Sequence, residues 1–130
     1  MRFMMIMLPG ITEEQYEQFQ HDPPVDAIAA MGKYNDELAK AGALLALDGL
    51  HPPTKGARVS FEGGKPRVTD GPFAEAKELI GGYWLIQAKS KEEAVEWASR
   101  CPAQQGDVIE VRQVQEQEDF PPEVQAALQS

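Results

Sequence analysis

The chain has 130 residues, of which 42% are hydrophobic and 25% are charged, and these proportions are typical of one soluble domain with its own core. Acidic residues outnumber basic ones by 21 to 12, and a net charge of −9 argues against nucleic-acid binding, which depends on neutralising phosphates. One cysteine permits no internal disulfide, and no apolar run is long enough to span a membrane. We therefore expect a single cytoplasmic domain over residues 1–130, with residues 116–130 as its C-terminal tail.

The N-terminal segment predicts a central strand followed by a short helix. Residues 3–8 are apolar on both alternating faces, as expected of a strand covered on two sides, and they are too few for a signal peptide. Thr12 and Gln15 have the spacing of a capping box, in which side chains and backbone amides bond reciprocally at a helix start. Tyr16 and Phe19, three residues apart, share one face of that helix.

A long helix and a short strand follow. Residues 25–41 carry apolar side chains at intervals of four and three, which predicts one helix with a single apolar stripe. Gly42 is well placed to end this helix, because glycine readily adopts the left-handed conformation found there. Residues 44–47 are all apolar and predict a short buried strand.

Residues 57–69 predict a β-hairpin with a positive patch. Two alternating segments flank Gly63 and Gly64, which together are a hairpin signal. Residues 54–69 hold one acidic side chain, Glu62, and four basic ones: Lys55, Arg58, Lys65 and Arg67. This patch could hold an anionic substrate. The simpler interpretation, which we favour, is a soluble hairpin whose edge is protected by charge.

The next segment predicts a strand and a second main helix. Residues 72–79 suit one or two helical turns. Residues 82–88 are rich in aromatic and branched side chains, as strands are. Ser90 and Glu93 repeat the capping-box pattern and open a helix that Pro102 ends.

The C-terminal segment predicts one more strand and a tail. The last strand is expected over residues 108–114. Beyond it the chain is acidic, and residues 120–128 suit a short helix docked on the domain. No internal repeat and no domain linker is present in the sequence.

The order of these elements predicts an α+β fold of the ferredoxin-like βαββαβ kind with an inserted β-hairpin. Two main helices between pairs of strands would cover one face of an antiparallel sheet. The first strand is also apolar on its other face, and too few helices remain to cover it. A second copy packed sheet to sheet is the simplest cover, so we expect a homodimer.

One long motif carries a family resemblance. Residues 69–83 resemble the DGPF signature of the YCII-related family, with DGPF itself at residues 70–73. The likeness extends to the methionine-rich first strand and to residues 40–42, 49–53 and 99–102. The long motif is specific, whereas each flanking piece is weak by itself. The resemblance implies a dimeric α/β barrel of ferredoxin-like subunits.

The resemblance also implies two kinds of function. Some relatives in the broader superfamily look like small lyases that use a histidine on the first long helix and an aspartate before a proline. Here that helix has no histidine, and Cys101 precedes Pro102, so the pair does not carry over. Other relatives lie beside, or are fused to, alternative sigma factors, which implies a regulatory association.

Asp70 and His51 are the candidate catalytic residues. Asp70 precedes Gly71 and Pro72 at an expected strand–helix junction, where a buried carboxylate could act as a general base. Alternatively it only bonds to nearby amides in a turn, which we favour. His51 precedes two prolines and could transfer protons near neutral pH, although a loop histidine is more often a surface residue.

Four further side chains are candidates for substrate binding: Tyr34, Tyr83, Lys77 and Arg67. The two tyrosines also suit core packing, and the two cations also suit a solvated surface. We expect no metal, because the two histidines lack metal-ligand spacing, and no cofactor, because no phosphate-binding or dinucleotide motif occurs.

Two functional hypotheses follow. In the first, the protein binds a small molecule near Asp70 and could perform cofactor-free proton transfer of the lyase or isomerase type. In the second, it is a non-enzymatic regulatory partner in an alternative sigma-factor system. An enclosed polar pocket around Asp70 would favour the first hypothesis, and an exposed apolar patch would favour the second.

Overall fold

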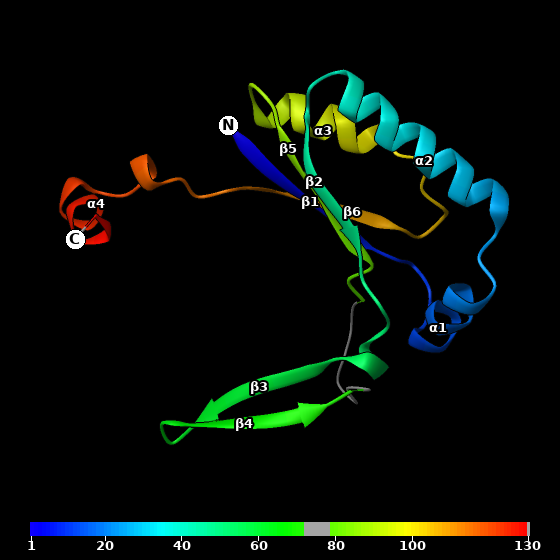
Figure 1. Cartoon of the computed structure of the whole chain (residues 1–130), viewed down its shortest axis with the longest axis horizontal. Helices are drawn as coiled ribbons and strands as arrows, with labels where there is room; N and C mark the ends of the chain where they lie inside the picture. The colour runs from blue at the N-terminus through cyan, green and yellow to red at the C-terminus, as the bar shows by residue number, and fades with distance from the viewer. Residues whose placement is uncertain (72–78, 130) are drawn as a thin grey trace.

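The computed structural model describes residues 1–71 and 79–129 of the chain (Figure 1). Within them the strands are β1 (Arg2–Leu8), β2 (Leu44–Gly49), β3 (Ala57–Glu62), β4 (Lys65–Asp70), β5 (Gly82–Gln87) and β6 (Val108–Gln113). The α-helices are α1 (Glu13–His21), α2 (Val25–Lys40), α3 (Lys91–Ser99) and α4 (Pro122–Leu128). Two 3-10 helices are η1 (Pro53–Lys55) and η2 (Gln117–Asp119). The helical turns predicted over residues 72–79 fall almost wholly outside the described residues.

Four strands form an antiparallel sheet in the order β2-β5-β1-β6, and β3 and β4 form a separate hairpin. The apolar strand β1 is central, as predicted, because it pairs with both β5 and β6. With α2 between β1 and β2 and α3 between β5 and β6, this is the ferredoxin-like βαββαβ pattern. The prediction of an α+β fold with an inserted hairpin is confirmed.

The first capping box forms as predicted, and the second forms in part. Thr12 accepts a hydrogen bond from the Gln15 amide at 3.1 Å, and the Gln15 side chain accepts one from the Thr12 amide at 2.9 Å. At α3, Ser90 accepts from the Glu93 amide at 3.2 Å. The Glu93 carboxylate bonds instead to the amide of Lys89 at 3.3 Å, so the reciprocal bond is displaced by one residue.

The core lies between the sheet and the helices α2 and α3. Its largest fully buried side chains are Phe3, Met5, Leu38 and Ile86. Side chains at alternate positions of β1 and β5 point to this face, which is the period of a strand. The helices therefore bury the centre of one face of the sheet, and the side chains at its margins are partly buried.

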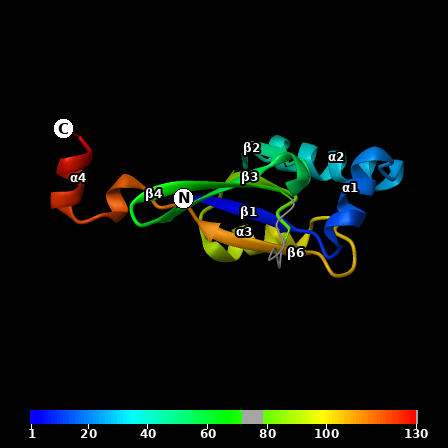
Figure 2. The ribbon, with the colours of Figure 1, turned by 90° about the horizontal axis from the view of Figure 1, so that it is seen from below.

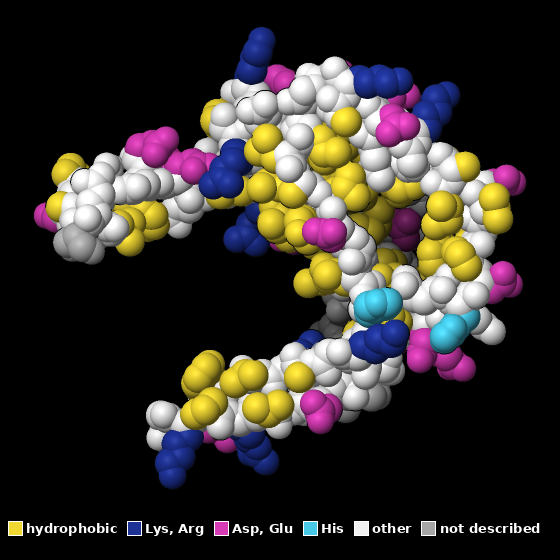
Figure 3. Space-filling view, viewed as in Figure 1, with side chains coloured by type: hydrophobic (Ala, Val, Ile, Leu, Met, Phe, Trp, Pro, Cys, Tyr) yellow, Lys and Arg dark blue, Asp and Glu magenta, His cyan; other side chains and the backbone are white. Residues whose placement is uncertain are grey.

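The opposite face of the sheet has no helix packed over it among the described residues. Its centre is apolar and half-buried, and includes Met4, Ile6 and Leu85. Figure 3 shows hydrophobic side chains gathered over the sheet in the hollow between the hairpin and the C-terminal segment. The described residues agree with the expectation that the two main helices cover one face of the sheet, and the homodimer stays a prediction.

The hairpin β3–β4 projects from the body of the protein (Figures 1 and 2). Every residue of both strands is exposed. Val59 lies opposite Val68, and Phe61 lies opposite Pro66, so the apolar side chains share one face of the hairpin. This face has no cover from the described part of the chain.

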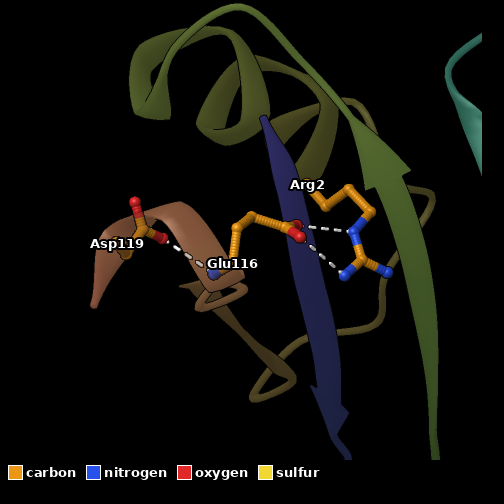
Figure 4. A network of polar contacts seen from close by, with 3 residues as sticks. All are labelled: Arg2, Glu116 and Asp119. Atoms are coloured by element: carbon orange, nitrogen blue, oxygen red, sulfur yellow. Dashed lines mark hydrogen bonds and ion pairs between the residues drawn. The ribbon is translucent and has the colours of Figure 1, made fainter. Parts of the chain in front are cut away.

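The C-terminal segment is anchored at the start of β1 and then leaves the body. The Arg2 guanidinium bonds to both carboxylate oxygens of Glu116, at 2.6 and 3.0 Å, and the Glu116 amide donates to Asp119 at 2.8 Å (Figure 4). Hydrogen bonding to Arg2 lowers the pKa of Glu116, so this carboxylate stays ionised near neutral pH. The predicted helix over residues 120–128 forms as α4.

The prediction that this helix docks on the domain is wrong for the single chain. Figure 2 shows α4 well away from the sheet. Val124 and Leu128 are exposed, and the main packing partner of α4 is η2. The anchor at Glu116 directs the following residues outward, which leaves this apolar surface without cover.

No helix in the described ranges is long and apolar enough to cross a membrane.

Candidate functional site

A cleft of about 990 Å³ opens beside the end of β1. Its walls are α1, the first half of α2, the ends of β1 and β2, and the loop that precedes β6. Most of the lining is apolar, with Met7, Ile11, Phe19, Leu50, Met31 and Pro102 among its side chains. The polar side chains in the lining, apart from Tyr16, are Gln20, Asp26, His51, Gln104 and Asp107.

Tyr16 connects α1 to the ends of two strands. Its side chain is buried, and its hydroxyl lies 2.5 Å from the Leu50 carbonyl oxygen and 3.1 Å from that of Gly81. Burial raises the pKa of Tyr16, so the phenol remains protonated and donates to this carbonyl pair. The contact holds one wall of the cleft against the sheet.

Asp107 fixes the opposite wall. Its carboxylate accepts hydrogen bonds from the amides of Gly10 and Gln104, both at 2.9 Å. The loops also pack closely at Gly10, where an added Cβ would lie 2.4 Å from the carbonyl carbon of Gly106. A side chain larger than hydrogen therefore has no room at Gly10, and the two loops form one unit.

His51 lies at the mouth of the cleft. It follows Leu50, whose amide donates to the Gly81 carbonyl at 2.9 Å, and it precedes the buried Pro52. The histidine side chain is exposed while both neighbours are held by the fold. An imidazole in this position can meet a molecule bound in the apolar part of the cleft.

Sequence comparison is consistent with this architecture. The profile of the YCII-related domain matches residues 1–118. The chain belongs to the YCII-related family. It is also similar to the uncharacterized protein R00369 of Rhizobium meliloti (strain 1021), with 38% identity over 73 residues. That alignment spans 56% of this chain and 56% of the relative, so it covers about half the length of each.

Of the predicted site residues that the structure describes, only His51 lines the cleft of this YCII-related protein. Asp70 is exposed at the end of β4, opposite Ala57. Arg67 is also on the hairpin, where it pairs with Glu62 at 3.3 Å. Lys77 lies outside the described residues. The catalytic role of Asp70 and the binding roles of Arg67 and Lys77 stay predictions.

The two tyrosines among the predicted residues occupy opposite faces of the sheet. Tyr34 is in the core, where its hydroxyl donates to the Trp97 carbonyl at 2.6 Å and burial raises its pKa. Tyr83 is on the open face, and its hydroxyl donates to Asp48 at 2.8 Å. This hydrogen bond to Asp48 raises the pKa of Tyr83, so the phenol stays neutral. Neither tyrosine is part of the cleft lining.

Cys101 is half-buried, and its sulfur lies 4.0 Å from that of Met31. Burial raises the pKa of this thiol to about 11, which leaves little reactive thiolate near neutral pH. Among the described residues, no three His, Cys, Asp or Glu side chains gather as a metal site would require.

Five polar cleft residues are absent from the predicted site: Tyr16, Gln20, Asp26, Gln104 and Asp107. The sequence places Tyr16 on one helix face with Phe19, and this spacing gives no sign of a bond to residues 50 and 81. Asp107 follows Gly106, which is a common turn pattern. Its contact with Gly10 spans 97 positions of the chain, and no local signal reports such a pairing.

Replacing Tyr16 by phenylalanine should lower the free energy of unfolding by about 1 kcal/mol, because two backbone carbonyls lose their common donor. Urea unfolding followed by circular dichroism measures this change. The apolar contacts of the ring are retained, so the effect reports on the hydroxyl. An unchanged unfolding midpoint and slope would contradict the role given to this hydrogen bond.

Proposed function

We propose that this YCII-related protein binds a small, mainly apolar molecule in the cleft and transfers a proton to or from it through His51, without a cofactor. The observation that carries the proposal is a mainly apolar cleft with a few polar side chains, His51 among them, in its lining. Its volume lies within the range of small-molecule sites, about 300–1,000 Å³. The site differs from the one expected near Asp70, because His51 lines the cleft and Asp70 does not.

The lining favours an uncharged ligand. Asp26 and Asp107 contribute carboxylates, and no lysine or arginine is among the described lining residues. A carboxylate or phosphate on the ligand would therefore meet like charge without a cation to offset it. A neutral carbonyl compound with an apolar ring fits these walls, with its polar end toward His51.

The chemistry available at His51 is general acid–base catalysis. A neutral imidazole can accept a proton from a carbon next to a carbonyl group, and the resulting imidazolium can return the proton to another atom of the same molecule. The apolar walls would exclude water from the rest of the ligand. Asp107 has a positioning role, because its carboxylate is already bonded to two backbone amides.

The binding step can be tested with the neutral fluorescent probe N-phenyl-1-naphthylamine. Ala27 lines the cleft from α2, and Ala29 on the same helix does not. We expect Ala27→Phe to weaken probe binding at least about tenfold, because the ring occupies the site and each 1.4 kcal/mol lost is a factor of ten. Ala29→Phe is the matched control and should bind the probe like the unmodified chain.

Ala30→Phe provides a second filled cleft if Ala27→Phe does not fold. Full probe binding by a folded variant of either kind would exclude the cleft as the binding site.

The proton-transfer step is tested with benzoylacetone, a neutral carbon acid, by following deuterium exchange at its central carbon by NMR. His51→Gln should lose most of the protein-dependent exchange and keep probe binding; equal exchange by both proteins would reject His51 as the base.

We also propose that a second copy of the chain covers the open face of the sheet. The apolar centre around Met4, Ile6 and Leu85 is contiguous across β1 and β5, which pair directly. At its margin Arg112 and Glu110 neutralise each other at 3.2 Å. Such a face can meet its own copy across a two-fold axis despite the negative net charge of the chain.

A further inference from the structure

Two projecting segments of the chain carry opposite charge. The hairpin arm, residues 55–70, holds four basic side chains (Lys55, Arg58, Lys65, Arg67) against two acidic ones (Glu62, Asp70). The tail arm, residues 114–129, holds four acidic side chains (Glu116, Glu118, Asp119, Glu123) and no basic one. In a chain with a net charge of −9, the hairpin arm is therefore the surface that attracts an acidic segment.

Both arms also expose apolar side chains on one face. On the hairpin arm, Val59, Phe61 and Val68 are 53%, 76% and 66% exposed. On the tail arm, Val124 and Leu128 are four residues apart on α4, so they share a helix face, and both are exposed. Each arm thus combines an exposed apolar strip with a net charge, which is positive on the hairpin arm and negative on the tail arm.

The two arms leave the sheet at opposite ends. The hairpin arm departs where Gly49 and Gly82 pair, next to Met7, and the tail arm departs after Gln113, which pairs with Phe3. Phe3 and Met7 are four positions apart on β1, which corresponds to about 13 Å at the usual rise of a strand. Figure 1 shows both arms on the side away from α2 and α3, with a wide space between them.

In a sheet-to-sheet dimer, a two-fold axis that is perpendicular to the strands and lies between the sheets reverses the strand direction of the second copy. The end of one sheet where the hairpin arm departs would then lie over the end of the other sheet where the tail arm departs. We propose that the tail arm of each chain docks on the hairpin arm of its partner, with α4 against the apolar strip of the hairpin. This inference rests on the proposed sheet-to-sheet dimer, and it assigns the arms a role that the dimer by itself does not require. The contact occurs twice, because the interface is isologous.

The test uses charge reversal in two variants. The hairpin-reversed chain carries Lys65→Glu and Arg67→Glu, and the tail-reversed chain carries Glu118→Lys and Glu123→Lys. These side chains are all exposed, and Glu116 and Asp119 are left intact because they anchor the tail. Circular dichroism confirms that each variant is folded.

Sedimentation velocity then gives the dimer dissociation constant of each chain. We expect each variant alone to dimerise at least about tenfold more weakly than the unmodified chain, because attraction becomes repulsion at both copies of the contact. An equimolar mixture should return to the unmodified value. In the mixed dimer a negative hairpin meets a positive tail, and a positive hairpin meets a negative tail.

Each other outcome has a definite meaning. An unmodified chain that stays monomeric rejects the sheet-to-sheet dimer and the arm contact together. A dimer whose dissociation constant is the same in both variants rejects the arm contact alone. Weakened variants that are not rescued by mixing also overturn it, because a contact within one chain, or with some other surface, would not be restored by a complementary partner.

Discussion

Replacing Leu85 by arginine is expected to convert the proposed dimer into monomers, with a dissociation constant raised at least about a hundredfold. Leu85 lies near the centre of the open face, opposite Met4. In the proposed dimer the arginine would be buried without an acidic partner. Each of the two subunits would bury one such charge, because the interface is symmetric. An uncompensated buried charge costs several kcal/mol, and each 1.4 kcal/mol is a factor of ten.

The measurement is the molar mass by light scattering across a concentration series. Gln87→Arg is the matched control, because Gln87 is on the same face and strand but is exposed at its end. It should leave the mass unchanged. A Leu85→Arg protein that is still dimeric at low micromolar concentration would place the interface elsewhere on the molecule.

The second large effect is expected one residue further along β5. Ile86 is completely buried in the core, where it pairs with Phe3 and Leu44 across neighbouring strands. Ile86→Ala should lower the free energy of unfolding by about 3 kcal/mol, through lost apolar contacts and the cavity left behind. Domains of this size unfold at about 5–15 kcal/mol, so the loss is a large fraction of the total.

This second effect is best measured by urea unfolding in the Leu85→Arg background, where the stability of the chain does not depend on its concentration. Leu47→Ala is the matched control, since Leu47 borders the same core but is only half-buried. It should cost clearly less than Ile86→Ala. A loss below about 1 kcal/mol at Ile86 would show that the core relaxes around the substitution, contrary to the close packing expected of an interior.

Leu85 and Ile86 are adjacent on β5 but lie on opposite faces of the sheet, one on the open face and one in the core. The sequence alone predicted part of this difference between the two faces. Alternation along a strand is a local property, so the two apolar faces of residues 3–8 could be recognised without knowing their partners. Counting the helices available to cover those faces then predicted one open face. Capping and turn signals located α1, α3 and the hairpin for the same reason, because each depends on residues close together in the chain.

The site was predicted less completely. His51 could be proposed from sequence because a loop histidine between a glycine turn and two prolines is conspicuous by itself. Asp70 belongs to an equally conspicuous motif, yet it lies on the exposed hairpin and not in the cleft lining. A turn signal indicates where the chain bends and contains no information about which cavity lies nearby.

The sequence by itself determined the order of the elements, the faces of the strands and the family, since these follow from periodicity, caps and a contiguous motif. Only the tertiary structure decided where the cleft opens and where the tail goes. The cleft depends on Tyr16 meeting residues 50 and 81 and on Asp107 meeting Gly10, and the tail on Arg2 meeting Glu116 across 114 positions. Contacts of that range are set by strand register and packing, which no short stretch of sequence specifies.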